Sequence, residues 1–346
     1  MIKIYTDNTF LNDDNYRAYI YPLLTLLRDN NPTLAYAFSL VNTIQESHIV
    51  ILPVAIEYLF KRNKKAYVSS FIENAKEFDK PVFTFTSGDI GLSIKDQNVY
   101  NLRLGGFKSK MNARTFMMPP FIIDPYLFFN KEVLYLKKTQ LPTVGFVGHS
   151  NGSFIKLIKE FLLYLKTTFK VIFRKEYIDY QSFYPSSFFR HKYLLKLQAF
   201  KEDINTNFIF RKNYRAGAKT KEEKYKTSLE FYNNIFQNQY TFCMRGVGNW
   251  SVRFYETLAM GRIPILINTD CNLPFSKKIK WDKHCVIVND NKFKTINSKL
   301  KQFHSQFTEE GFIELQKSNR ELWINYFAKE SFFKVMAADI ENLIKR

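Results

Sequence analysis

Residues 240–270 read YTFCMRGVGNWSVRFYETLAMGRIPILINTD and predict a strand, a turn, a helix and a second strand in succession. Both ends of this segment are apolar, as in strands that are buried on both faces of a parallel sheet. Between them, a glycine-containing turn at 245–248 precedes a stretch whose apolar residues recur every fourth position: Trp250, Phe254 and Leu258. Asn249 or Ser251 is expected to cap that helix. This order is typical of a βαβ unit and predicts an α/β protein with a mainly parallel sheet.

The turn at 245–248 lies where α/β proteins bind anions. It follows a strand and precedes a helix, so free backbone N–H groups and the helix dipole favour a phosphate there. Arg245 adds a cation suited to a diphosphate, and Arg253 lies near the same opening. Glu256, further along the helix, is placed to accept hydrogen bonds from sugar or ribose hydroxyls. The segment therefore predicts a ligand site at the carboxyl edge of the sheet.

The spacing of these residues alone leaves simpler interpretations open. Arg253 and Glu256 are three positions apart on the predicted helix, so they would also form a surface ion pair contributing roughly 0.2–0.5 kcal/mol. Gly246 and Gly248 would also make a plain turn. The turn is not a Walker loop, and no G-x-G-x-x-G follows the opening strand.

The order of residues in this segment resembles the signature of exostosin-like glycosyltransferases (glycosyltransferase family 47). The resemblance is strong over 240–286 and thin elsewhere, where the strand and D-x-G at 82–91 and the strand and glycine at 143–148 are similar to the family. Two positions depart from its pattern, Arg262 in place of a common Cys and Gly88 in place of a common His. The matching residues are Phe242, Cys243, Arg245, Gly246, Ser251, Arg253, Glu256, Leu258, Gly261, Ile263, Pro264, Asp270, Leu273, Pro274, Phe275, Trp281 and Val286.

The resemblance implies the GT-B fold, in which two Rossmann-like domains face each other across a cleft and a C-terminal helix crosses back to the first. We expect an N-terminal acceptor-binding domain at 1–140, a sugar-nucleotide-binding domain at 141–320 and the returning helix at 321–346. A length of 346 residues suits two domains. Several prolines between 117 and 142 favour a connector there.

The resemblance also implies the reaction. A hexosyl or pentosyl group would pass from a nucleoside-diphosphate sugar, with UDP as the expected nucleotide, to a hydroxyl of a glycan or lipid-linked saccharide. Inversion at the anomeric carbon is implied, with no metal and no other cofactor. We expect surface polysaccharide or glycoconjugate synthesis as the context. The residues expected to bind the donor are Arg245, Gly246, Ser251, Arg253, Glu256 and His149.

An inverting reaction needs a general base beside the acceptor hydroxyl. Asp89 is the candidate, because it follows the apolar strand at 81–86, where active-site loops lie. An ordinary turn aspartate remains the alternative for Asp89, and a turn histidine without a ligand remains the alternative for His149.

Other stretches give coarser predictions. Residues 58–76 favour a helix, and 154–165 favour another that follows the strand at 143–147. The apolar residues 171–174 (VIFR) predict a short strand, and residues 320–343 have helical spacing.

The chain is strongly basic, with a net charge of +19. Such a charge attracts nucleic acid, anionic membranes or phosphorylated ligands, although a biased coding composition would also produce it. Three scattered cysteines suit a reducing compartment. The start of the chain does not resemble a signal peptide, and the apolar stretch at 49–60 is too short to span a bilayer. We expect a cytoplasmic protein with peripheral contact to anionic lipid at the inner face of the cytoplasmic membrane.

Two other functions remain open at this point. A nucleic-acid-binding protein would share the basic, aromatic composition, but no helix-turn-helix, zinc-finger or RRM signature is present, so no nucleic-acid partner is expected. A GT-B-like scaffold or sugar-binding protein without catalysis is the other. The presence of Arg245, Arg253 and Glu256 favours the enzyme over that scaffold.

Overall fold

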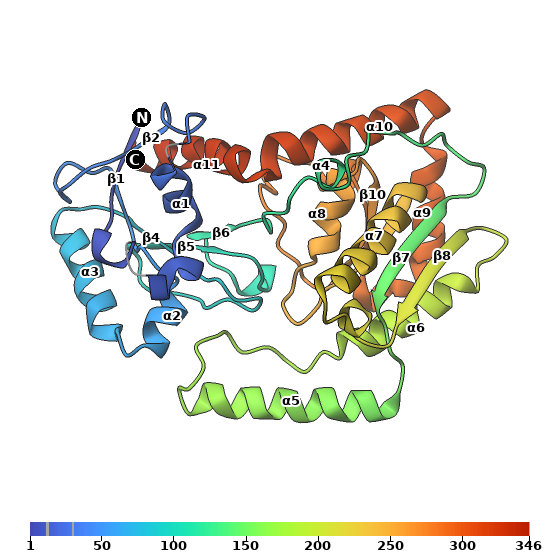
Figure 1. The fold of residues 1–346 in the computed structure, drawn as a ribbon, viewed down its shortest axis with the longest axis horizontal. Coiled ribbons are helices and arrows are strands. Elements are labelled where there is room, and N and C mark those ends of the chain that lie inside the picture. Colours follow the sequence, from blue (N-terminus) through green and yellow to red (C-terminus); the bar gives the residue numbers. More distant parts are fainter. Residues whose placement is uncertain (12–13, 30, 346) are drawn as a thin grey trace.

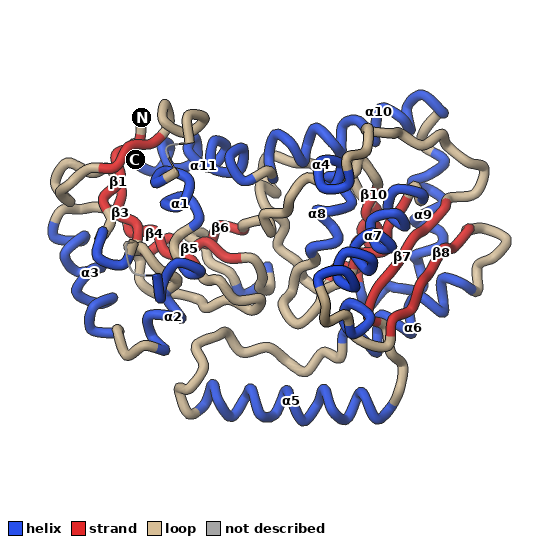
Figure 2. Tube along the Cα trace, viewed as in Figure 1, coloured by secondary structure: helices blue, strands red, loops and turns tan. Residues whose placement is uncertain are grey.

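The computed structural model describes residues 1–11, 14–29 and 31–345, which form two lobes with one parallel sheet each (Figures 1 and 2). The first sheet has the order β2-β1-β3-β4-β5-β6, and every pairing in it is parallel. Its strands are β1 (Ile2–Tyr5), β2 (Phe38–Leu40), β3 (Ile49–Ile51), β4 (Val82–Phe85), β5 (Val99–Arg103) and β6 (Thr115–Met117).

The helices of the first lobe are α1 (Pro22–Arg28), α2 (Ile56–Lys61) and α3 (Lys65–Glu77). The helix predicted at 58–76 is thus divided in two. The division falls at Asn63, which has a left-handed φ of 57° that a continuous helix does not allow.

The second sheet has the order β11-β10-β9-β7-β8 and is also parallel throughout. Its strands are β7 (Thr143–His149), β8 (Asn205–Arg211), β9 (Tyr240–Cys243), β10 (Ile263–Asn268) and β11 (Val286–Asn289). Its helices are α6 (Ser186–Gln198), α7 (Lys221–Gln237), α8 (Val252–Ala259), α9 (Ile296–Ser305) and α10 (Glu309–Leu322), and a short helix α4 (Pro125–Phe129) lies in the connector. The predicted strand, turn, helix and strand at 240–270 are confirmed as β9, α8 and β10.

Helix α5 (Phe154–Ile172) corrects the prediction for its region. The predicted helix at 154–165 is seven residues longer, and the strand predicted at 171–174 is wrong because those residues continue or follow the helix. The apolar run there keeps the helical period and pairs with no strand among the described residues. Figure 1 shows α5 running along the lower edge of the molecule, beneath both lobes.

The end of the chain returns to the first lobe. Helix α10 continues through a π-helical turn, Trp323–Phe327, into α11 (Lys329–Ile344). Phe332, Phe333 and Met336 are buried in the core of the first lobe. Figure 1 shows α10 and α11 passing along the top of both lobes. The two parallel α/β sheets and the returning helix confirm the expected GT-B arrangement. Within the described ranges, no helix has the length and apolar character that crossing a membrane requires.

Candidate active site

The turn after β9 presents its residues at the carboxyl edge of the second sheet. All four residues of β9 are buried, and α8 begins at Val252, so the intervening turn is held between two core elements. Ser251 occupies the N-cap position but its side chain makes no capping hydrogen bond, so the prediction that it caps is wrong. Gly246 faces open space, since a Cβ added there would meet no atom within 4 Å.

Arg245 is almost fully buried beside this turn. Its Nη2 donates to Gln181 Oε1 at 2.6 Å and to the Val247 carbonyl at 2.8 Å. The guanidinium lies 4.9 Å from the ring centre of Tyr184 and 5.4 Å from that of Phe107, which belongs to the first lobe. Burial lowers the pKa of Arg245, but an arginine remains charged in proteins. The cation is thus held rigidly by neutral groups.

Arg253 and Glu256 do not pair with each other. Arg253 Nη2 donates to the Val147 carbonyl at 2.8 Å, and its guanidinium lies 4.3 Å from the ring centre of Phe146. Glu256 Oε1 accepts a hydrogen bond from Tyr232 at 2.9 Å, while its buried Oε2 has no partner among the described residues. Burial raises the pKa of Glu256. The alternative of a simple surface ion pair is therefore wrong.

His149 and Arg245 are joined through Arg190, a residue of α6. Arg190 Nη1 donates to the His149 carbonyl and Nη2 donates to the Arg245 carbonyl, both at 2.7 Å. This links the ends of β7 and β9 and brings His149 beside the turn. The His149 imidazole lies 3.4 Å from Ser187 Oγ. Burial, with Lys156 and Arg190 nearby, lowers the pKa of His149, so the ring is neutral at pH 7.

Three arginines thus converge on one edge without a carboxylate partner. None of Arg190, Arg245 and Arg253 forms an ion pair with any described residue, and the Nε of each is buried without a hydrogen-bond partner. Buried charge is costly unless it is compensated. An arrangement of this kind is suited to an anionic ligand that supplies the missing negative charge.

Asp89 is brought against this turn from the first lobe. Its carbonyl accepts a hydrogen bond from Trp250 Nε1 at 3.1 Å. A Cβ at Gly248 would lie 2.0 Å from that carbonyl oxygen and one at Gly105 would lie 2.4 Å from it, so both glycines are needed for this close approach. The Asp89 side chain is exposed, and partial desolvation by the surrounding protein raises its pKa. The structure therefore brings Asp89 and the turn at 245–248 together.

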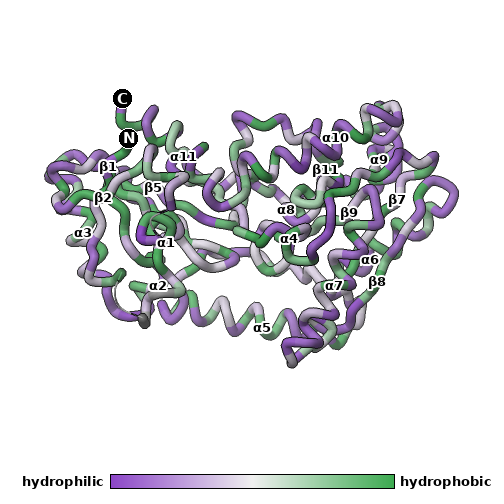
Figure 3. Tube along the Cα trace, turned by 45° about the horizontal axis from the view of Figure 1, so that its top comes forward, coloured by the Kyte–Doolittle hydropathy of each residue, from purple (hydrophilic) through white to green (hydrophobic). Residues whose placement is uncertain are grey.

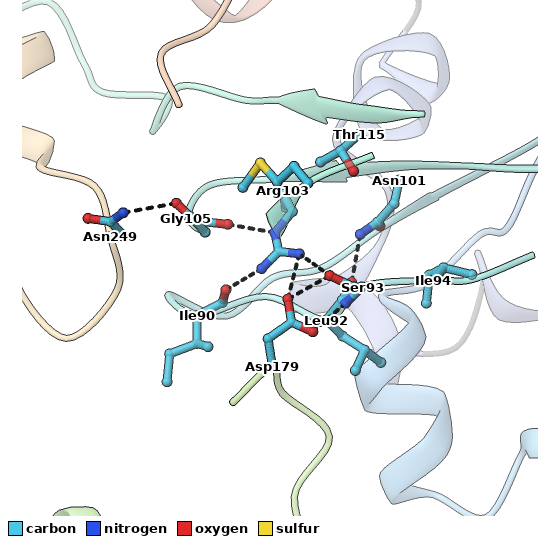
Figure 4. Close-up of polar contacts among 12 residues, drawn as sticks. Ile90, Leu92, Ser93, Ile94, Asn101, Arg103, Gly105, Thr115, Asp179 and Asn249 are labelled. Carbon is cyan, nitrogen blue, oxygen red and sulfur yellow. Dashed lines mark hydrogen bonds and ion pairs between the residues drawn. The ribbon is translucent and has the colours of Figure 1, made fainter. Parts of the chain in front are cut away.

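The loop that carries Asp89 is held by Arg103 at the end of β5 (Figure 4). Arg103 donates to the carbonyls of Ile90 and Gly105, and its Nη1 lies 2.8 Å from Asp179 Oδ2. Asp179 also accepts hydrogen bonds from the Ser93 N–H at 2.7 Å and hydroxyl at 2.8 Å. Arg103 is thus a buried arginine whose charge is balanced within the protein.

Two further side chains position the facing loops, and neither role was found from the sequence. Glu57 Oε1 accepts hydrogen bonds from the N–H and the hydroxyl of Ser87, both at 2.7 Å. Asn249 Nδ2 donates to the carbonyls of Gly106, Thr269 and Asp270, so Asn249 joins the two lobes instead of capping α8. In the sequence, Glu57 stands out only as a single acidic residue within the apolar run at 49–60. Nothing in the sequence marks Asn249 except its place in the turn.

No group of three or more His, Cys, Asp or Glu side chains suited to a metal ion occurs among the residues that the structure describes. Nothing in this structure tests the roles predicted for Arg245, Gly246, Ser251, Arg253, Glu256, His149 and Asp89, which stay predictions. In the structure, Asp89 lies on the loop after β4, His149 ends β7, Arg245, Gly246 and Ser251 lie between β9 and α8, and Arg253 and Glu256 lie in α8.

Residues 194–303 match the model of the Exostosin GT47 domain. This part of the chain is similar to that domain. It reaches from the end of α6 to α9 and includes the turn after β9 and helix α8. His149 and Asp89 lie outside it. The predicted resemblance to exostosin-like glycosyltransferases is therefore confirmed for the second lobe.

Curated relatives of the domain are animal and plant proteins. Exostosin-1 of Bos taurus is 29% identical over 124 residues, which are 35% of this chain and 15% of that protein. A probable glucuronosyltransferase of Oryza sativa subsp. japonica is 31% identical over 70 residues, 20% of this chain and 16% of that protein. The chain thus matches only about a sixth of the length of these relatives.

Solved structures show a slighter likeness. An alpha1,3-fucosyltransferase is 13% identical with a TM-score of 0.37, over 100% of this chain and 90% of the other. A glycosyltransferase from Rickettsia africae is 11% identical with a TM-score of 0.38, over 98% of both chains. TM-scores this low support no inference about function.

Proposed function

We propose that this protein is a glycosyltransferase that moves a hexosyl or pentosyl group from a nucleoside-diphosphate sugar to a hydroxyl of a glycan or lipid-linked saccharide. Its context would be surface polysaccharide or glycoconjugate synthesis. The exostosin GT47 domain supports the class of enzyme. The observation that carries the proposal is a set of three arginines at the carboxyl edge of the second sheet, Arg190, Arg245 and Arg253. None of the three has a carboxylate partner among the described residues.

In this proposal the second lobe, within residues 141–320, binds the donor. The diphosphate lies at the turn 245–248 and the N-terminus of α8, where Arg245 and Arg253 offset its charge. Gly246 leaves room for it, because no protein atom lies within 4 Å of the position that a Cβ would take. The free Oε2 of Glu256 accepts a hydrogen bond from a sugar or ribose hydroxyl, while Tyr232 fixes its other oxygen.

The first lobe, within residues 1–140, supplies the acceptor and the base. The acceptor hydroxyl attacks the anomeric carbon and loses its proton to the Asp89 carboxylate, and the nucleoside diphosphate leaves with inversion. A base works best when its pKa approaches the working pH, so the raised pKa of Asp89 suits this role. The arginines stabilise the negative charge that develops on the leaving diphosphate. The neutral His149 ring contacts the donor from the end of β7.

The test is a transfer assay with a panel of UDP-, GDP-, CMP- and ADP-sugars and saccharide acceptors, read by mass spectrometry of the product with and without a chelator. We expect one nucleotide sugar to give product, with the same yield when the chelator is present. Binding of a donor without product for any acceptor would instead favour the scaffold. Loss of product on chelation would overturn the metal-independent reaction.

A further inference from the structure

Helix α5 exposes an unusual amount of apolar surface. None of its residues is buried, although more than half of them are apolar. Phe154, Ile155, Ile158, Leu162, Phe169 and Ile172 are each between 46% and 69% exposed. At 100° per residue they fall within a sector of about 100° of the helix. Contiguous apolar surface of this kind marks an interaction site on a protein.

A row of lysines follows the edge of that apolar sector. Lys159, Lys166 and Lys170 are exposed and occupy the next roughly 40° of the helix. Glu160 is the helix's acidic residue and lies on the more buried side, near Lys156. The exposed face therefore combines large apolar side chains with positive charge alone. Figure 3 shows hydrophobic and hydrophilic positions alternating along α5.

One side of α5 packs against the segment that follows the helix, and that segment is attached to the first lobe. Phe183 packs against the rings of Phe161 and Tyr164 at 5.1 and 5.5 Å between centres, so the opposite face is directed outward. After the helix, Glu176 forms an ion pair with Lys61, and Asp179 pairs with Arg103. These contacts fasten the segment after α5 to the first lobe.

We propose that α5 is an interfacial helix that docks the protein on an anionic lipid surface. The apolar sector enters the boundary between headgroups and acyl chains, and the lysine row contacts lipid phosphates, as in other amphipathic helices that lie in a membrane plane. This inference goes beyond glycosyl transfer and does not depend on it. Part of the net charge of +19 would then contact anionic lipid through the lysine row of α5.

The charge on this face favours lipid over a second copy of the chain. Two α5 helices packed together through their apolar sectors would place Lys159, Lys166 and Lys170 beside the same lysines of the other copy. Two chains of charge +19 would also repel each other. An anionic bilayer offers an apolar interior and negative charge together, so it complements both features of the helix.

Docking through α5 would also direct the candidate site toward the bilayer. The helix begins five residues after His149, the last residue of β7, and therefore at the carboxyl edge of the second sheet. The segment after α5 contacts the loop that carries Asp89, since the Asp179 N–H donates to the Gly91 carbonyl at 2.8 Å. A lipid-linked acceptor would then approach from the side on which both edges lie.

The experiment is flotation of the full chain with vesicles of phosphatidylcholine alone or mixed with phosphatidylglycerol, at low and high salt. We expect flotation with the anionic vesicles that weakens in high salt. The double variant Leu162→Glu, Phe169→Glu should weaken partitioning roughly tenfold or more per residue, because the burial of each side chain is lost. Ile324→Glu, the same type of change at one exposed apolar residue in the turn after α10, should leave flotation unchanged.

Charge is tested separately. A triple variant in which the lysine row is changed to glutamate should bind anionic vesicles more than fivefold more weakly per lysine, because each side chain changes the sign of its charge. The three residues are Lys159, Lys166 and Lys170. The control changes three lysines of α7 to glutamate, Lys221, Lys224 and Lys226. It alters the net charge equally and should weaken vesicle binding much less. Circular dichroism of each variant shows that it is folded.

Three results would overturn the proposal. The first is that the wild type does not float with anionic vesicles. The second is that the α5 variants float as well as their controls. The third is that the wild type binds neutral and anionic vesicles equally at low salt. A concentration-dependent dimer that Leu162→Glu dissolves, without vesicle binding, would identify a second copy as the partner instead. Since no sugar nucleotide is used, these results are independent of the proposed transfer reaction.

Discussion

The carboxyl edges of the two sheets face each other but carry opposite chemistry. At the first edge, the buried Arg103 is balanced by Asp179, and the loop there presents the exposed carboxylate of Asp89. At the second edge, Arg245 and Arg253 use neutral carbonyls, an amide and aromatic rings as partners. The first edge therefore pairs its buried Arg103 with a carboxylate, whereas the second edge pairs Arg211 with Glu230 but leaves Arg245 and Arg253 without one. An arginine without a carboxylate partner has charge available for a phosphate, and a balanced one does not.

The largest expected effect comes from Asp89 at the first edge. Asp89→Asn should lower kcat by about 10²–10⁴-fold because the base is removed, while donor affinity stays unchanged. In the wild type, partial desolvation by the surrounding protein raises the pKa of Asp89, so kcat/KM should fall as the pH drops through a value above the usual aspartate range. That acid limb should be missing from the residual activity of Asp89→Asn. A variant that retains full kcat, or loses donor binding instead, would remove Asp89 from its proposed role.

The next effect concerns Arg245 at the second edge. Arg245→Met should weaken donor binding by about 1.5–3 kcal/mol, the usual contribution of a charge-assisted hydrogen bond. The control is Arg211→Met at the end of β8, because Arg211 is already paired with Glu230. That variant should lose stability but keep donor affinity. Calorimetric titration of both variants checks this, and an equal loss in the two would mean that the pairing of an arginine does not decide its role.

The contact between the edges is tested by two glycines of one turn. Gly248→Ala would place a Cβ 2.0 Å from the Asp89 carbonyl oxygen, so the free energy of unfolding should fall by roughly 1–3 kcal/mol. Gly246→Ala meets no atom within 4 Å and should change stability by less than about 0.5 kcal/mol, yet weaken donor binding by crowding the diphosphate. Denaturant unfolding of the two proteins measures the difference. If both are equally stable, the close approach of the lobes is not fixed by Gly248.

The smallest effect is expected at Glu256. Its pKa is raised by burial, so the stabilising contribution of its neutral form is complete below about pH 4.5 and is lost as the pH rises through the higher folded-state value. At pH 7 the ionised side chain therefore lowers stability. Glu256→Gln keeps an acceptor for Tyr232 and should raise the free energy of unfolding by about 0.5–1 kcal/mol at pH 7. The same variant should bind donor more weakly, and an unchanged affinity would exclude Glu256 from the donor site.

The second edge was more predictable from sequence than the first, for a physical reason. Strand β9, the glycine turn and helix α8 are adjacent in the chain, so hydrophobic periodicity and turn residues suffice to place Arg245, Arg253 and Glu256. The partners of these side chains lie elsewhere. Tyr232 comes from α7 and the Val147 carbonyl from β7, which is why spacing alone left a surface ion pair open.

The first edge depends on contacts between residues far apart in the chain. Arg103 and Asp179 are separated by 76 positions, and the Asp89 carbonyl meets Trp250 across the two lobes. The error in α5 has a different cause. A short apolar run such as 171–174 suits a strand or the end of a helix equally, and periodicity does not distinguish them. An exposed apolar helix also breaks the usual expectation that apolar residues are buried.

The central claim is that the donor diphosphate binds the arginines of the second edge. The most direct measurement is the thermal stability of the wild type, Arg245→Met and Asp89→Asn against UDP, GDP, CMP, ADP and their sugars. We predict that one nucleotide sugar at about 100 times its dissociation constant adds roughly 2.7 kcal/mol to the stability of the wild type and of Asp89→Asn, and clearly less to Arg245→Met. Stabilisation of none of the three proteins by any nucleotide, or an equal loss in both variants, would contradict the account.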